Sequence, residues 1–212
     1  MKTSEIYTIE SFVNTFIYHS YVIEENQEYT FIISPELNQS EELFSHLTRG
    51  GFFHIGFNNL RYHYVILHHF LNNFRNYKYE SGLFVSGDLH FKSDQLRNSE
   101  EIVYIPNNEI KIIQIDLKSL FHLNYKGKNT TLNDVKFMFH SKDLNEILFP
   151  SEYWVKEDEV EVILDKCKSD VLAIYNLYCL TRGKSNNPVY SGVDELKLRS
   201  GIRKQFGLKC YN

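Results

Sequence analysis

The sequence predicts an α/β sandwich, in which helices cover a mixed β-sheet. Three observations predict it. The first 34 residues are dominated by short segments rich in β-branched and aromatic side chains. Farther along, two short apolar runs alternate with segments whose apolar residues recur every three or four positions. A chain of 212 residues is also long enough to bury a substantial core.

Three strands are predicted at the N-terminus, at residues 6–12, 15–23 and 29–33. Polar turns separate them at Val13-Asn14 and at residues 24–27. Because these connections are short, we expect consecutive strands to pair as an antiparallel meander.

A helix and a strand follow the meander. Residues 40–47 place Leu43, Phe44 and Leu47 on one side, which predicts a short amphipathic helix. Ser40 is its expected N-cap, and Arg49-Gly50-Gly51 ends it. The apolar run 52–57 predicts a buried strand.

A second helix is predicted at residues 62–72, after a turn at Asn58 and Asn59. Residues 75–109 are polar and predict no regular element. The run Lys111–Leu117 predicts another buried strand.

The C-terminal part of the chain predicts helices. The first covers 131–139 and is capped by Thr130 or Thr131; a long one covers 160–180, and a last one covers 193–206.

Composition and charge narrow the class of protein. The net charge of -4 argues against a chain coated in positive charge, although a nuclease that holds phosphates through metal ions needs no broad basic patch. The 16 Phe and 15 Tyr indicate a core built from rings or, alternatively, a base-stacking surface. Cys167, Cys179 and Cys210 lack metal-ligand spacing, and no signal peptide or membrane span is apparent, so a cytoplasmic location is expected.

Three segments carry the residues of chemical interest. The first is Tyr7-Thr8-Ile9-Glu10, the second is Gly56-Phe57-Asn58-Asn59-Leu60-Arg61-Tyr62-His63, and the third is Lys166-Cys167-Lys168-Ser169-Asp170-Val171. Hydrolysis of phosphodiesters by two metal ions needs several carboxylates around the ions. Positions i and i+2 of a strand point to one face, so residues 8 and 10 suit such a site.

In these segments the chain resembles the 3′–5′ exonuclease domain of bacteriophage-type DNA polymerases, which is ribonuclease H-like and belongs to the DEDD superfamily. Its motifs are Asp-Ile-Glu, Gly-Phe-Asn-Asn-x-x-Tyr-Asp, and Tyr-x-x-x-Asp-Val. Ile115-Asp116-Leu117, Thr130-Thr131-Leu132 and residues 196–208 are similar to further family segments. The resemblance spans nearly the whole chain in order.

The resemblance implies a ribonuclease H-like mixed sheet whose first three strands are antiparallel. It divides the chain into an exonuclease-type domain at 1–180 and a helical extension at 181–212 that resembles the linker to a polymerase domain. The implied partners are single-stranded DNA or a DNA 3′ end, and a DNA polymerase or replication protein. The implied cofactor of an active enzyme is Mg²⁺ or Mn²⁺. The implied catalytic positions are Thr8, Glu10, His63 and Asp170, the metal ligands are Glu10 and Asp170, and the nucleic-acid contacts are Asn58, Asn59 and Tyr62.

The chain departs from the family at three catalytic positions. Thr8 and His63 replace aspartates, and Lys166 replaces the tyrosine that orients the attacking water. These changes predict an impaired enzyme that acts as a binding module. Three alternatives stay open: a site of Glu10, His63 and Asp170 around Mn or Zn, residual magnesium-dependent activity that also uses Asp116, and a fragment of a split polymerase.

Each candidate residue also has a purely structural interpretation. Glu10 suits an exposed strand carboxylate, and His63 suits a hydrogen-bonded histidine at a helix cap. Asp170 suits a surface ion pair with Lys166 or Lys168. Asn58 suits the turn geometry, and Asp116 suits a structural acid at a strand end.

Overall fold

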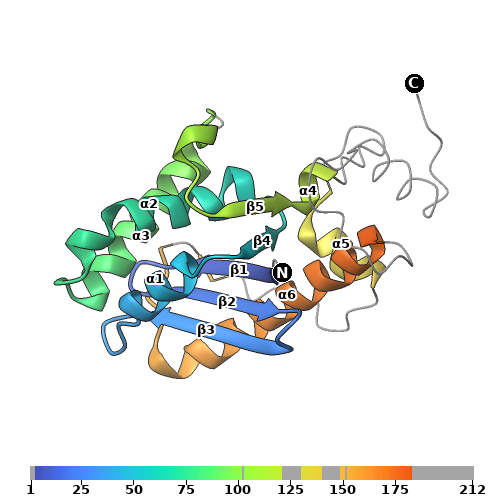
Figure 1. The fold of residues 1–212 in the computed structure, drawn as a ribbon. Coiled ribbons are helices and arrows are strands. Elements are labelled where there is room, and N and C mark those ends of the chain that lie inside the picture. Colours follow the sequence, from blue (N-terminus) through green and yellow to red (C-terminus); the bar gives the residue numbers. More distant parts are fainter. Residues whose placement is uncertain (1–2, 102, 121–129, 140–148, 151, 183–212) are drawn as a thin grey trace.

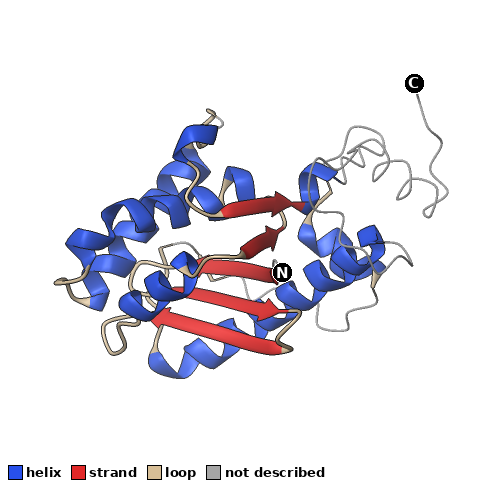
Figure 2. Cartoon of the chain, in the orientation of Figure 1, coloured by secondary structure: helices blue, strands red, loops and turns tan. Residues whose placement is uncertain are grey.

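The structure is a computed structural model that describes residues 3–101, 103–120, 130–139, 149–150 and 152–182. A sheet of five strands in the order β3-β2-β1-β4-β5 forms the centre, and helices flank it (Figures 1 and 2). The α/β class predicted from the sequence is therefore confirmed. No helix in these described ranges is both long enough and apolar enough to cross a membrane.

The sheet is mixed. The strand β1 pairs antiparallel with β2, and β2 pairs antiparallel with β3, whereas the β1–β4 and β4–β5 pairs are parallel. All five predicted strands exist. Their bounds are Thr3–Ser11 (β1), Phe16–Val22 (β2), Gln27–Ile33 (β3), Phe52–Gly56 (β4) and Ile113–Asp116 (β5).

Six α-helices lie within the described residues: Ser40–Thr48 (α1), His63–Tyr77 (α2), Gly82–Asn98 (α3), Leu117–Leu120 (α4), Leu132–Met138 (α5) and Val160–Arg182 (α6). Short 3-10 turns occupy Asn59–Arg61, Asn107–Glu109 and Glu157–Glu159. The predicted helix at 193–206 and the predicted extension at 181–212 lie outside the described residues, apart from residues 181 and 182, which end α6.

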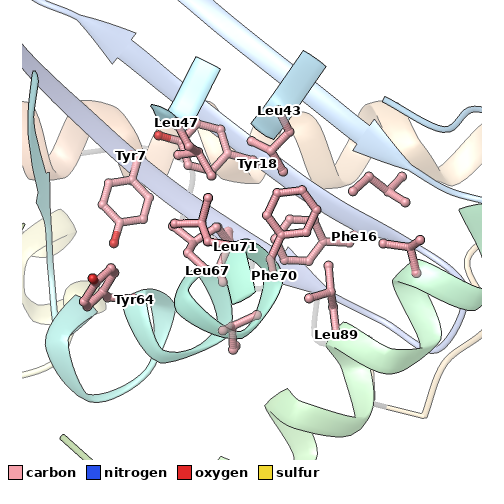
Figure 3. Packing of buried hydrophobic residues seen from close by; sticks show 14 of the residues in the cluster. Tyr7, Phe16, Tyr18, Leu43, Leu47, Tyr64, Leu67, Phe70, Leu71 and Leu89 are labelled. Atoms are coloured by element: carbon pink, nitrogen blue, oxygen red, sulfur yellow. The ribbon is translucent and has the colours of Figure 1, made fainter. Parts of the chain in front are cut away.

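One face of the sheet is covered by α1, α2 and α3 (Figure 3). Ile9 and Tyr18 lie opposite each other on β1 and β2 and therefore share this face. The aromatic residues of the chain are concentrated here, which agrees with a core built from rings. The labelled members of the cluster are Tyr7, Phe16, Tyr18, Leu43, Leu47, Tyr64, Leu67, Phe70, Leu71 and Leu89.

The other face of the sheet is covered by α6, which packs on β1 and β2, with α5 beside it. Ile6 contributes to a cluster with Val171 and Ile174, and Ile17 contributes to a second cluster with Ile163 and Cys167. Because side chains alternate along a strand, Ile6, Thr8 and Glu10 all point toward α6. This face therefore carries the candidate catalytic residues of β1.

The helix α3 corrects the sequence analysis, which assigned no element to residues 75–109. Its buried side is made largely of small residues, including Gly82, Ser86 and Ser93, so it lacks an apolar stripe. Small residues allow close packing: a Cβ on Gly82 would lie 1.9 Å from the carbonyl oxygen of Ser34. The Ser81 hydroxyl caps the helix by accepting from the Phe84 amide at 3.2 Å.

Two predictions about local structure need adjustment. Ser40 is the first residue of α1 rather than its N-cap, because the preceding loop presents the Asn38 side-chain oxygen, which accepts from the Ser40 amide at 3.2 Å. The strand β5 is shorter than predicted and only Asp116 is buried, because β5 is an edge strand. Thr131, one of the two residues predicted as the cap, is the N-cap of α5.

A carboxylate, two imidazoles and a phenol form a polar cluster inside the first core. Glu5 of β1 is fully buried; its Oε1 lies 2.5 Å from His46 Nε2 and accepts from the Tyr18 hydroxyl at 3.0 Å. His54 Nδ1 lies 3.2 Å from Oε2 without hydrogen-bond alignment. Burial raises the pKa of Glu5, but the hydrogen bond with His46 and the charges of both histidines outweigh it, so the pKa falls well below its usual range.

Asn14 joins the tip of the β1–β2 hairpin to the segment that leads into α6. Its side-chain amide donates to the Val155 carbonyl at 2.8 Å, and its side-chain oxygen accepts from the Val155 amide at 2.9 Å. Both residues are buried. This reciprocal pair sets where the chain enters α6 relative to the end of β1.

Candidate functional site

Glu10 and Asp170 are brought together by a lysine. Glu10 lies near the end of β1, and Lys166 and Asp170 lie one turn apart on α6. The Lys166 ammonium donates to Glu10 Oε1 and also to Asp170 Oδ2, the latter at 3.3 Å. The two predicted metal ligands therefore share one neighbourhood, and a cation of the chain itself lies between them.

A second lysine, which the sequence analysis missed, completes this group. Lys136 of α5 forms an ion pair with Asp170 Oδ1, and each side chain of the pair is only 7% exposed. Its position in the sequence could have revealed it. Leu132, Val135 and Lys136 fall on one helix face at i, i+3 and i+4, so a lysine occupies an inward position. We call Glu10, Lys136, Lys166 and Asp170 the charge cluster.

His63 begins α2, and its ring centre lies 6.1 Å from that of Tyr7 and 5.5 Å from that of Tyr62. Burial lowers its pKa to about 4; the charge of Asp170 raises the pKa and that of Lys166 lowers it. The imidazole is therefore neutral at pH 7. Its Nδ1 is enclosed and has no hydrogen-bond partner within the described residues. His63 is thus close enough to Asp170 and Lys166 for its pKa to respond to their charges.

Thr8 lies two residues before Glu10 on the same face of β1 and is 2% exposed. A hydroxyl at this position adds no negative charge to the charge cluster. Asp170 pairs with Lys166 as the structural interpretation expected, but Asp170 is buried under the sheet, with its side chain 7% exposed, whereas that of Lys166 is 30% exposed. Lys168 instead pairs with Asp165 at 3.1 Å on the exposed side of α6.

The loop after β4 is held by β5. Asn58 adopts a left-handed conformation with φ of 60°, and its amide donates to Asp116 Oδ1 at 2.9 Å. Asp116 also accepts from the amides of Leu60 and Lys118, at 3.3 and 2.9 Å, which is the role of a structural acid. Asn59 is fully buried and donates to Gln114 Oε1 at 2.7 Å, so its amide group faces inward.

Two arginine–tyrosine pairs lie beside this loop. The Arg97 guanidinium at the end of α3 lies 5.6 Å from the Tyr62 ring centre, and the Tyr62 hydroxyl bonds to Ser93. Burial raises the pKa of Tyr62, and the nearby Glu10 charge adds to the rise. Arg61 lies 5.9 Å from the ring centre of Tyr104, which is 57% exposed. We call these four residues the arginine–tyrosine rim.

The side chains around Glu10 and Asp170 do not fit a divalent ion. Magnesium and manganese need several oxygen ligands that are free to turn toward the metal. Here both carboxylates are bonded to ammonium groups, and residues 8 and 63 supply a hydroxyl and an imidazole. Within the part of the chain that the structure describes, no three His, Cys, Asp or Glu side chains are grouped so that they could hold a metal ion.

Comparison of the chain with protein-family models, with curated proteins and with solved structures gave no match.

Proposed function

We propose that this protein is a ribonuclease H-like domain of the 3′–5′ exonuclease type that holds a single-stranded DNA end without cutting it. The observation that carries the proposal is the placement of Lys166 between Glu10 and Asp170. Where an exonuclease of this type would use metal ions to contact the scissile phosphate, this chain has ammonium groups neutralising the acids.

The strand arrangement supports the fold part of the proposal. Three antiparallel strands are followed by two parallel ones, in the order β3-β2-β1-β4-β5. The three segments that resemble exonuclease motifs come from β1, from the start of α2 and from α6. Glu10 and Asp170 share Lys166 as a partner, and the pKa of His63 responds to the charges of Asp170 and Lys166. Such proximity is what a common catalytic ancestry predicts.

The charge cluster supports loss of catalysis. Hydrolysis requires an activated water, and Mg²⁺ supplies it through carboxylate ligands. The chain offers two acids, both paired, and the neutral His63 is a poor magnesium ligand. An ammonium ion can attract a phosphate, but it cannot lower the pKa of a bound water as a metal ion does.

The arginine–tyrosine rim supports binding of a single strand. Arginines attract the phosphate backbone, and aromatic rings stack on bases of any sequence. Tyr104 is exposed and so is accessible to a base, and Tyr62 is close enough to Glu10 for the two to interact electrostatically. A strand bound along the rim would therefore end near the charge cluster.

Fluorescence anisotropy with a labelled single-stranded oligonucleotide tests the binding. We expect Arg97→Ala to weaken binding by about tenfold at low salt, because it removes a phosphate contact and the cation beside Tyr62. Arg75→Ala is the matched control, because Arg75 is exposed near the opposite end of α2 from His63. No retention of DNA by the wild-type protein at low salt would refute the binding function.

A gel assay tests the absence of cleavage. A 5′-labelled single strand is incubated with the protein in Mg²⁺ or in Mn²⁺, and we expect its length to stay unchanged. Shortening from the 3′ end would establish the alternative, an active exonuclease with altered ligands. If DNA is neither bound nor cut, a DNA polymerase or replication protein becomes the partner to test by co-purification.

A further inference from the structure

The charge cluster is balanced without a metal ion. Its two carboxylates and two ammonium groups contribute equal and opposite charge, and three ion pairs connect them. Buried carboxylates require a compensating cation, and in metal-dependent sites a divalent ion fills that role. Here both compensating cations are side chains of the chain itself.

The Lys166 ammonium donates to both carboxylates, to Glu10 Oε1 and to Asp170 Oδ2. An ammonium group beside both carboxylates repels a divalent ion brought to the same place. Competition for this position is thus electrostatic as well as steric.

We infer that Lys136 and Lys166 are the resident cations of Glu10 and Asp170, and that Lys166 excludes divalent ions from a latent metal site between them. The two lysines differ in their exposure and in the number of carboxylates that they contact. The Lys136 side chain is 7% exposed and contacts only one of the carboxylates, whereas that of Lys166 is 30% exposed and bridges both. Lys166 is therefore the group whose removal opens the position.

The design uses Lys166→Met, which removes the ammonium and keeps the apolar stem, and Thr8→Asp, which adds a carboxylate two residues before Glu10. The wild type, both single variants and the double variant are titrated with Mn²⁺ by calorimetry, and thermal unfolding is followed with and without Mn²⁺. We expect no binding by the wild type and weak binding by Lys166→Met. The double variant should bind tightest, by at least about tenfold over Thr8→Asp alone.

Bound Mn²⁺ should raise the thermal midpoint of the double variant by roughly 3 °C at ten times the dissociation constant. Lys168→Met is the matched control, because Lys168 is an exposed lysine of the same helix whose partner is Asp165; it should bind no Mn²⁺. Glu10→Gln in the double variant should abolish the gain and so locate the ion.

Equal Mn²⁺ affinity of Thr8→Asp and the double variant would overturn the inference, because Lys166 would then exclude nothing. A folded double variant that binds no Mn²⁺ would overturn it too. If the double variant does not fold, Lys166→Met decides alone: a midpoint that rises with Mn²⁺ supports the inference, and an unchanged midpoint refutes it. No DNA is present, so the result is independent of the proposed function.

Discussion

Lys136→Met tests how much the enclosed ion pair with Asp170 contributes to stability. Removing one partner of a buried pair costs about 3–5 kcal/mol, because the other charge is left without compensation. Asp170 keeps a second ammonium neighbour, since Lys166 lies 3.3 Å from its other oxygen. We therefore expect a loss just below this range, about 2–3 kcal/mol of unfolding free energy.

Urea unfolding at pH 7 measures this loss. Asp170→Asn and the double variant complete a mutant cycle, and the double variant should recover about 1 kcal/mol or more relative to the sum of the single losses. Lys168→Met serves as control and should cost less than about 1 kcal/mol, since its ion pair is exposed. A loss below about 0.5 kcal/mol for Lys136→Met would refute the account of a buried, compensating ammonium.

Two further changes test other parts of the fold. Gly82→Ala should destabilise by about 3 kcal/mol, because its Cβ would overlap the Ser34 carbonyl, whereas Gly87→Ala in the same helix has only one contact at 3.7 Å and should stabilise slightly; equal urea midpoints for the two would contradict this packing. His63 has a folded pKa of about 4, below its unfolded value, so its neutral form stabilises the fold fully above pH 6.5 and the effect is lost as pH falls toward 4. Between pH 6.5 and 4, the unfolding free energy of His63→Gln should fall less than that of the wild type. The difference should be at most about 3 kcal/mol, and solvent screening reduces it further. Parallel pH profiles for variant and wild type would exclude this role of His63.

The elements that follow local rules were predictable from the sequence. β-Branched and aromatic runs located all five strands, a polar cap located α5, and the long helix predicted at 160–180 matches α6. The helix α3 was missed because its inward residues are glycine and serine as often as valine and leucine. What makes that face suitable for burial is the close approach of the loop at Ser34, a tertiary contact with no signature in the helix itself.

The candidate site was predictable in its location but not in its electrostatics. Resemblance to known motifs pointed to Glu10, His63 and Asp170; Lys166 bonds to Glu10 and to Asp170, and the charge of Asp170 affects the pKa of His63. Lys166 was noticed as a replaced tyrosine, yet its bond to Glu10 joins residues 156 positions apart. Lys136 shares a helix face with Leu132 and Val135, but its partner Asp170 belongs to α6, and this pairing has no signature in the sequence of α5.

The reciprocal hydrogen bonds between Asn14 and Val155 have a consequence for how this protein can change by mutation. They fix the entry of α6, so the number of residues between Val155 and Lys166 determines which side of the helix meets the sheet. Each inserted or deleted residue would turn the helix by roughly 100° and carry both Lys166 and Asp170 away from Glu10. Along this stretch, point substitutions should be tolerated far better than changes in length.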